Sequence, residues 1–320
     1  MWIPQTLRPL LLAAVITSLA IVVPASAQEK KAPTAVKHRI DTHIHLYDTT
    51  RPGGVPWPPA DDTVLYHPHL PDEYRKEAQA AGVTGVVIVE ASDRLEDNRW
   101  VLDLVGDDKF FVALVGNIDP YRKDFGQQLK KLRQDKRFVG VRARLQGKKI
   151  DYADPQVLAS FRQLAEAGLS LDVLMQESTP ESVRQVDELA RAVPSLRIIV
   201  NHVIGFPVNG ERPSQDWIEA VHRLAENKNV YCKVSGLYQR CVEQPASQDL
   251  ELYRPLLDIL WTEFGSERLI YGSNWPCTKK SGDYASFLSL VDQYFAGKGP
   301  EACERYYWQN AAEAYQLPLK

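Results

Sequence analysis

The chain has 320 residues, of which 44% are hydrophobic and 25% are charged, which is an ordinary globular composition. The formal net charge is −3 and no basic block occurs, so nucleic acid is not expected as a partner. This length allows two domains, but α/β barrels commonly reach it as one.

The N-terminus has the pattern of a secretory signal peptide. Arg8 is the only charge before Glu29, the run Leu10–Val23 is apolar, and Ala25-Ser26-Ala27 is a small-x-small cleavage site. We therefore expect an exported protein, periplasmic or secreted, without membrane contact after cleavage. The alternative is a membrane anchor, for which the apolar run is short.

Three parts follow from this pattern. Residues 1–27 are the expected signal peptide, residues 28–37 a polar tether, and residues 38–320 one folded domain. Export permits disulfides, but four cysteines are too few for a disulfide framework and their spacings match no zinc motif. Cys241 and Cys277 both follow strand-like runs, so pairing between them is an alternative to ordinary thiols.

Short runs rich in valine, isoleucine and leucine alternate with longer amphipathic segments. The expected strands are Arg39–Ile44, Gly85–Glu90, Phe111–Gly116, Val139–Ala143, Ser170–Leu174, Arg197–Asn201, Val230–Val234 and Leu269–Gly272. The expected helical segments are Asp72–Ala81, Asn98–Val105, Phe125–Gln134, Pro155–Ala167, Pro180–Val193, Gln215–Glu226, Leu252–Phe264, Tyr284–Phe295 and Pro300–Tyr315. Eight such units predict an α/β fold, a single (β/α)8 TIM barrel. An open doubly wound sheet is the alternative, but no Gly-x-Gly-x-x-Gly follows the first strand.

The first strand ends in two histidines, His43 and His45. Side chains alternate along a strand, so both imidazoles should face the same side. Such a pair forms half of a metal site or a polarising pair, or else an ordinary hydrogen-bonded pair.

Chemistry in TIM barrels takes place at the carboxyl ends of the strands. The polar residues expected there, after the two histidines, are Glu90, Asn117, Asp119, Arg142, Arg144, Gln176, His202, Lys233, Ser235, Ser273 and Asn274. His202 is the only other histidine at a strand end, so we predict that it joins His43 and His45 in a functional site.

A long loop, Tyr47–Pro71, separates the first strand from its helix. It contains six prolines and carries Trp57. Loops of this length in compact barrels are commonly lids or binding loops, although a solvated excursion is the alternative. His67-Pro68-His69 repeats the His-x-His spacing, but its proline and loop context favour loop structure over a second site.

Four motifs together resemble the amidohydrolase superfamily, and within it the amidohydrolase-related branch of sugar lactonases and 2-pyrone-4,6-dicarboxylate lactonase. The motifs are Asp41-Thr42-His43-Ile44-His45, Val200-Asn201-His202-Val203-Ile204-Gly205-Phe206-Pro207, Lys233-Val234-Ser235-Gly236 and Tyr271-Gly272-Ser273-Asn274-Trp275-Pro276. The resemblance implies a TIM-barrel hydrolase, often of lactones, with or without one divalent metal.

Position by position, the resemblance places the site at His43, His45 and His202. The eighth strand departs from the family pattern, because Asn274 stands where an aspartate usually accepts the proton of the attacking water. A carboxamide is not a general base. The fourth strand also lacks a bridging lysine or glutamate, and the fifth lacks a histidine, so a binuclear metal site is not expected.

Two mechanisms remain open. His43, His45 and His202 can bind one divalent metal, zinc by preference, whose bound water becomes hydroxide near neutral pH, with Asn274 orienting it. In the metal-independent alternative the imidazoles polarise the carbonyl and Glu90 is the base, unless Glu90 instead pairs with a neighbouring cation.

Substrate binding is predicted for Arg142, Arg144, Lys233 and Trp275. Arg142 and Arg144 share one face of the fourth strand and suit bidentate capture of a carboxylate, with Lys233 beside them. Trp275 would stack on a sugar ring. The alternatives are ion pairs at the rim and a packed indole.

We therefore interpret the chain as a hydrolase that opens a sugar lactone or a carboxylated lactone, a small-molecule substrate that is anionic in the second case. One rival is a catalytically impaired barrel that binds a small anionic metabolite, which Asn274 motivates. The other is a metal-dependent decarboxylase. The sequence decides neither the exact substrate, nor the metal, nor the oligomeric state.

Overall fold

The computed structural model describes residues 34–145 and 149–318. The expected signal peptide and the first six residues of the expected tether lie outside the described residues. The rest of the tether is bound to the domain, since the backbone N–H groups of Thr34 and Lys37 donate to Asp292 and Glu304, each over 2.8 Å. No helix in the described part of the chain is both long and apolar enough to cross a membrane.

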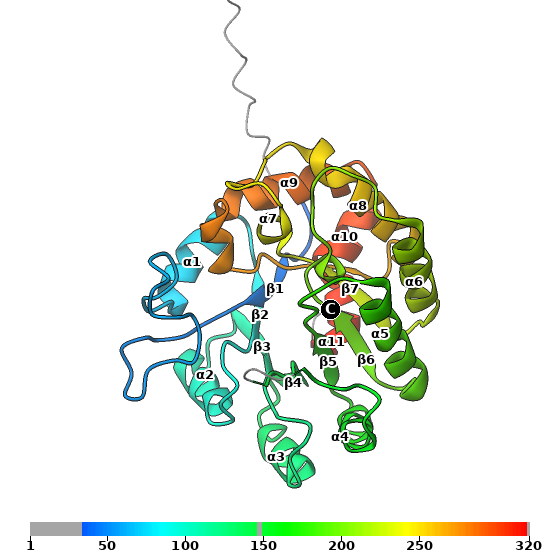
Figure 1. The fold of residues 1–320 in the computed structure, drawn as a ribbon. Coiled ribbons are helices and arrows are strands. Elements are labelled where there is room, and N and C mark those ends of the chain that lie inside the picture. The colour runs from blue at the N-terminus through cyan, green and yellow to red at the C-terminus, as the bar shows by residue number, and fades with distance from the viewer. Residues whose placement is uncertain (1–33, 146–148, 319–320) are drawn as a thin grey trace, which may run out of the picture. The chain divides into compact units, whose positions relative to one another are not determined.

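Eight parallel strands form a nearly closed barrel in the order β1 to β8, with helices around it (Figure 1). The strands are β1 (Ile40–Ile44), β2 (Gly85–Val89), β3 (Phe111–Gly116), β4 (Phe138–Val141), β5 (Ser170–Val173), β6 (Arg197–Val200), β7 (Val230–Val234) and β8 (Leu269–Tyr271). Backbone bonds from His45 N to Trp275 O and from Asn274 N to His43 O, each 2.8 Å, join β1 to the segment after β8. The predicted (β/α)8 barrel is confirmed.

The main helices follow the strands in the predicted order. They are α1 (Pro71–Ala80), α2 (Asp97–Val105), α3 (Phe125–Leu132), α4 (Pro155–Glu166), α5 (Pro180–Ala192), α6 (Gln215–Glu226), α8 (Leu250–Phe264) and α9 (Tyr284–Ala296). A short helix that the sequence did not predict, α7 (Leu237–Arg240), follows β7. The expected C-terminal helix is divided into α10 (Pro300–Glu304), η3 (Arg305–Gln309), which is a π-helical turn, and α11 (Asn310–Tyr315).

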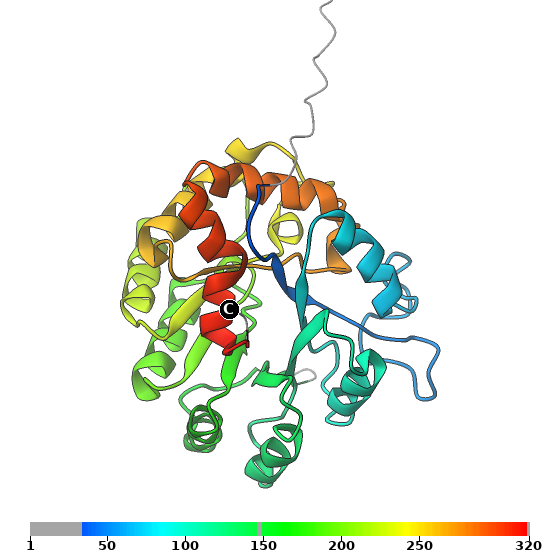
Figure 2. The ribbon, with the colours of Figure 1, turned by 180° about the vertical axis from the view of Figure 1, so that it is seen from behind.

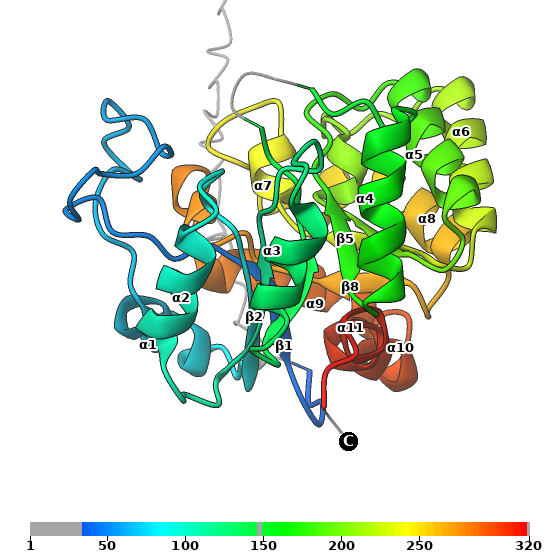
Figure 3. The ribbon, with the colours of Figure 1, turned by 90° about the horizontal axis from the view of Figure 1, so that it is seen from below.

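Apolar side chains fill two regions, one between strands and helices and one inside the barrel. The inner cluster includes Ala311, Ala314, Tyr315 and Leu317 from the C-terminal segment. Figures 2 and 3 show this segment across one end of the barrel, away from α7 and the loop after β1. Because one end is plugged, the carboxyl ends of the strands are left to form the site.

All four cysteines are free. Cys232, Cys241 and Cys303 are buried, and Cys277 is partly buried. The alternative of a bond between Cys241 and Cys277 is therefore not what the structure contains.

Candidate active site

A cavity of about 640 Å³ opens at the carboxyl ends of the strands. The predicted site residues that line it are His45, Glu90, Arg142, Arg144, His202 and Asn274. The barrel thus brings together residues that are far apart in the sequence.

His43 and His45 lie side by side, with ring centroids 5.1 Å apart and planes nearly perpendicular. The peptide carbonyl of Val89 is 3.0 Å from His45 Nδ1 and accepts its proton, which leaves Nε2 as the unprotonated nitrogen. His43 is fully buried beneath the cavity, and its ring is 4.4 Å from that of His202. The three predicted histidines therefore form one cluster.

Asp41 holds the end of β1 in place. Its Oδ1 accepts the backbone N–H groups of His43 and Ser273, and its Oδ2 accepts the hydroxyls of Tyr74 and Tyr284. Burial raises the pKa of this carboxyl, and the bonds from Ser273 oppose the shift. Asp41 thus has a structural role that ties β1 to β8.

His202 stands on an unusual stretch of backbone. His202, Val203 and Ile204 all have positive φ angles, which is uncommon for β-branched residues, and such strain concentrates at functional sites. The ring packs on Gly236, where a Cβ would lie 2.7 Å from His202 Nδ1. Ser235 Oγ is 3.0 Å from the same nitrogen and fixes the ring orientation.

Arg142 is enclosed between Glu90 and His43. Its Nε donates to Glu90 Oε1 over 2.7 Å, its Nη2 to the Glu90 carbonyl over 2.8 Å, and its Nη1 contacts His43 Nε2 at 3.2 Å. Both charged side chains are almost fully buried. The rim ion pair that the sequence left open as an alternative for Glu90 is thus formed with Arg142.

Burial lowers the pKa of His43, His45 and His202 well below the ordinary value, and the nearby positive charge of Arg142 lowers each further. The three imidazoles are therefore neutral at neutral pH. Burial raises the pKa of Glu90, while Arg142 opposes that shift.

Asn274 has a positive φ of 60°, a conformation that asparagine tolerates well. Its Nδ2 donates to Gln239 Oε1 over 3.2 Å, and Gln239 comes from the unpredicted helix α7. Nothing in the sequence points to Gln239, because no periodic pattern marks so short a helix.

Arg144 is half-buried and lines the cavity beside Trp57, with its guanidinium 5.9 Å from the indole centroid. Trp57 comes from the long loop after β1, and its ring meets the edge of His45 at 5.6 Å. The loop that the sequence predicts to be a lid or binding loop thus contributes Trp57 to the wall of the cavity.

Two residues predicted to bind substrate lie elsewhere. Lys233 is fully buried in the barrel, where its Nζ donates to Asp172 Oδ2 (2.8 Å) and Thr42 O (2.9 Å). Trp275 is fully buried against Tyr74. Neither side chain lines the cavity, so the prediction that they bind substrate is not supported. The rule identified residues at strand ends, but it does not say whether a side chain faces the cavity or the protein interior.

The three histidines do not fit a divalent cation as they are folded here. Within residues 34–145 and 149–318 they do not form a group whose donor atoms all lie within 4.8 Å. Arginine has only donors, so Arg142 must use the unprotonated Nε2 of His43, the nitrogen that a metal would need. A permanent cation therefore stands where the predicted metal would bind.

Cys277 also lines the cavity, which the sequence did not indicate. Burial raises the pKa of this thiol to about 12. It is therefore protonated at neutral pH and is not a nucleophile.

Comparison with known proteins identifies the family to which the chain belongs. Residues 40–317 match the family described as Amidohydrolase. The L-fucono-1,5-lactonase of Burkholderia ambifaria is 30% identical over 285 residues, which are 87% of this chain and 96% of that protein.

Two solved structures share the fold. An amidohydrolase from Burkholderia multivorans with bound zinc has a TM-score of 0.79 at 24% identity, over 88% of this chain and 100% of the other. A probable 2-pyrone-4,6-dicarboxylic acid hydrolase from Acinetobacter baumannii with bound citric acid has a TM-score of 0.70 at 17% identity, over 88% and 100%.

Proposed function

This chain belongs to the amidohydrolase family and is a hydrolase of the lactonase type, and we propose that it opens a sugar lactone by a metal-independent mechanism. The observation that carries the proposal is the cavity in which neutral His45 and His202 face the same space beside the buried Arg142–Glu90 pair. The lactonase relative supports this substrate class.

His45 is the proposed general base. Its Nδ1–H is held by the Val89 carbonyl, so its Nε2 accepts a proton from water as the water oxygen attacks the lactone carbonyl. Val89 also stabilises the imidazolium that forms. The carbonyl oxygen becomes negative in this step and requires donors.

His202 is the proposed donor. If the Ser235 hydroxyl donates to Nδ1, the proton of His202 lies on Nε2 and is available to the developing oxyanion. The tetrahedral intermediate then collapses, the ring C–O bond breaks, and the imidazolium of His45 gives its proton to the leaving alkoxide. The product is an open hydroxy acid, and His45 is neutral again.

Asn274 has a positioning role in this proposal. Its amide nitrogen is used by Gln239, so its oxygen is the group available to a water or a substrate hydroxyl. It replaces neither the base nor the oxyanion donor.

The arginines bear on the substrate. Arg142 already donates hydrogen bonds to Glu90 and His43. Arg144 is then the arginine of the cavity whose guanidinium is largely available to a substrate, since it is 3.9 Å from Glu90. One available arginine favours a neutral sugar lactone over a dicarboxylate. A carboxylated lactone is the second candidate, which Arg144 supports.

The test is turnover of an aldono-1,5-lactone and of 2-pyrone-4,6-dicarboxylate, followed by proton release with a pH indicator. We expect the wild type to open the sugar lactone, and His45→Gln to lower kcat by about 100-fold or more with little change in KM. Turnover by Asn274→Asp but not by the wild type would show the impaired, metabolite-binding barrel instead. Release of carbon dioxide would point to a decarboxylase.

We also propose export, on the pattern of residues 1–27. Expression of the full chain in a bacterial host should give a periplasmic protein whose mass corresponds to a start at Gln28. An uncleaved cytoplasmic product would contradict it.

A further inference from the structure

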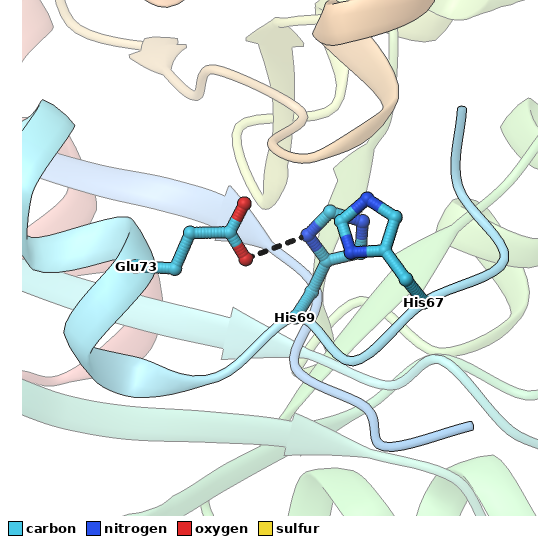
Figure 4. A group of neighbouring side chains, drawn as sticks. All are labelled: His67, His69 and Glu73. Atoms are coloured by element: carbon cyan, nitrogen blue, oxygen red, sulfur yellow. Dashed lines mark hydrogen bonds and ion pairs between the residues drawn. The ribbon is translucent and has the colours of Figure 1, made fainter. Parts of the chain in front are cut away.

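A second cluster of chemistry-bearing side chains lies on the loop between β1 and α1 (Figure 4). It consists of His67, which is exposed, His69, which is fully buried, and Glu73, which is partly buried in the first turn of α1. One donor atom from each lies within 4.8 Å of the others, and no other such group of three occurs among the described residues.

His69 is held at one nitrogen and unsatisfied at the other. Its Nδ1 is 3.0 Å from Glu73 Oε2, while its buried Nε2 has no partner. The rings of Tyr47 and Trp275, each 5.1 Å away, prevent the imidazole from turning toward water.

The rings of His67 and His69 lie with centroids only 4.0 Å apart. The contacts of the two rings run to the Pro68 carbonyl and to Glu73 Oε2 rather than to each other, so the imidazoles approach without a direct hydrogen bond, as two ligands of one ion would.

The local charge also favours a cation. Lys279 Nζ is 2.7 Å from Glu73 Oε1 and 2.9 Å from Glu77 Oε1. One ammonium group therefore pairs with two carboxylates, and negative charge is in excess. Glu73 meets Lys279 with one oxygen and His69 with the other. The second oxygen is therefore placed on the side of the histidines.

We propose that His67, His69 and Glu73 bind one divalent transition-metal ion, with zinc as the best match, and that the ion fastens the loop to α1. Two imidazoles and one carboxylate are a common zinc set, with water in the fourth position. Tetrahedral ligands are about 3.3 Å apart, so the donors need to close by about 1.5 Å at most. The exposed His67 side chain can make that movement by giving up the 3.2 Å contact between its Nδ1 and the Pro68 carbonyl.

Such an ion would act on the loop that carries the cavity wall. His69 exchanges two backbone hydrogen bonds with Tyr47 at the base of the loop, of 2.8 and 3.1 Å. Trp57 lies between these two points in the chain and lines the cavity. The site thus anchors the returning arm of the loop, outside the catalytic cavity.

The experiment is calorimetric titration of zinc into the purified full-length protein after removal of metal by a chelator and dialysis. We expect one zinc per chain, and at least 10-fold weaker binding in both His67→Ala and Glu73→Gln. The matched control is His222→Ala, which removes another exposed histidine that is 2.8 Å from a carboxylate, Glu263, but has no third donor. That variant should bind zinc like the wild type.

A second readout separates this site from the barrel histidines. Zinc should raise the melting temperature of the wild type and of His45→Gln, but not of His67→Ala. The proposal is overturned if the wild type binds no zinc, if His67→Ala and His222→Ala bind it equally, or if His45→Gln abolishes binding while His67→Ala retains it.

Discussion

Arg142 donates a hydrogen bond from Nη1 to Nε2 of His43 over 3.2 Å, at the centre of the barrel. Since a guanidinium only donates, this contact fixes the His43 proton on Nδ1. That nitrogen is buried without a partner. The contact places a permanent positive charge beside the histidine cluster, and this charge is the basis of the proposed metal-independent reaction.

Removal of Arg142 should destabilise the protein. Arg142→Met removes the close partner of the buried Glu90 carboxylate and leaves only Arg144, 3.9 Å away, and breaking such a buried pair costs about 3–5 kcal/mol. The double variant Arg142→Met/Glu90→Met should recover most of this loss, because it removes both charges. Urea unfolding of the two single variants, the double variant and the wild type measures the coupling. Additive effects would show that the pair contributes no coupling.

The pH profile should be flat through the ordinary histidine range. In the proposed mechanism His45 acts in its neutral form. Burial keeps its pKa well below 6.5, so acidification from pH 8 to pH 6 leaves this base unprotonated. We expect kcat/KM, corrected for spontaneous lactone opening, to fall only below pH 6. A decline centred at pH 6.5 or above would contradict the assignment of a buried neutral base.

Removal of metal should not stop catalysis. The comparison uses His67→Ala, which lacks the proposed loop site, so any effect of a chelator on it must come from elsewhere in the chain. We expect its kcat to change less than about 2-fold after chelation and dialysis, because Arg142 holds the nitrogen that a catalytic metal would need. A large loss restored by zinc would instead support the three-histidine metal site.

Alternation and chain order were enough to predict the barrel and the contact of His43 with His202, since both depend on local periodicity and on the common direction of parallel strands. Position along a strand does not give the depth of a side chain. Lys233 lies at the end of β7 but enters the barrel, because Asp172 from β5 supplies a buried partner. That pair joins two strands that lie on either side of β6, and no sequence pattern marks it.

Loop geometry was likewise beyond the sequence. His69 and Glu73 have the i,i+4 spacing of neighbours, but a helix start lies between them and a proline precedes His69. This context favoured ordinary loop structure. The cluster arises because the backbone of His69 pairs with that of Tyr47, and this pairing directs the His69 ring toward α1. The pairing depends on how the whole loop folds, which the sequence pattern does not indicate.

The last prediction concerns Trp57, the residue of the loop after β1 that lines the cavity. Trp57 contacts His45 and lies beside Arg144, so Trp57→Ala removes apolar surface from the cavity and a cation–π contact, together about 1–2 kcal/mol. We expect KM for the lactone to rise about 5- to 30-fold while kcat changes less, because no reacting proton passes through the indole. Tyr66→Ala is the matched control, since Tyr66 is on the same loop, is exposed and does not line the cavity. Equal effects of the two variants on KM would mean that the loop acts through its general order, whereas an effect of Trp57→Ala alone assigns the wall to that side chain.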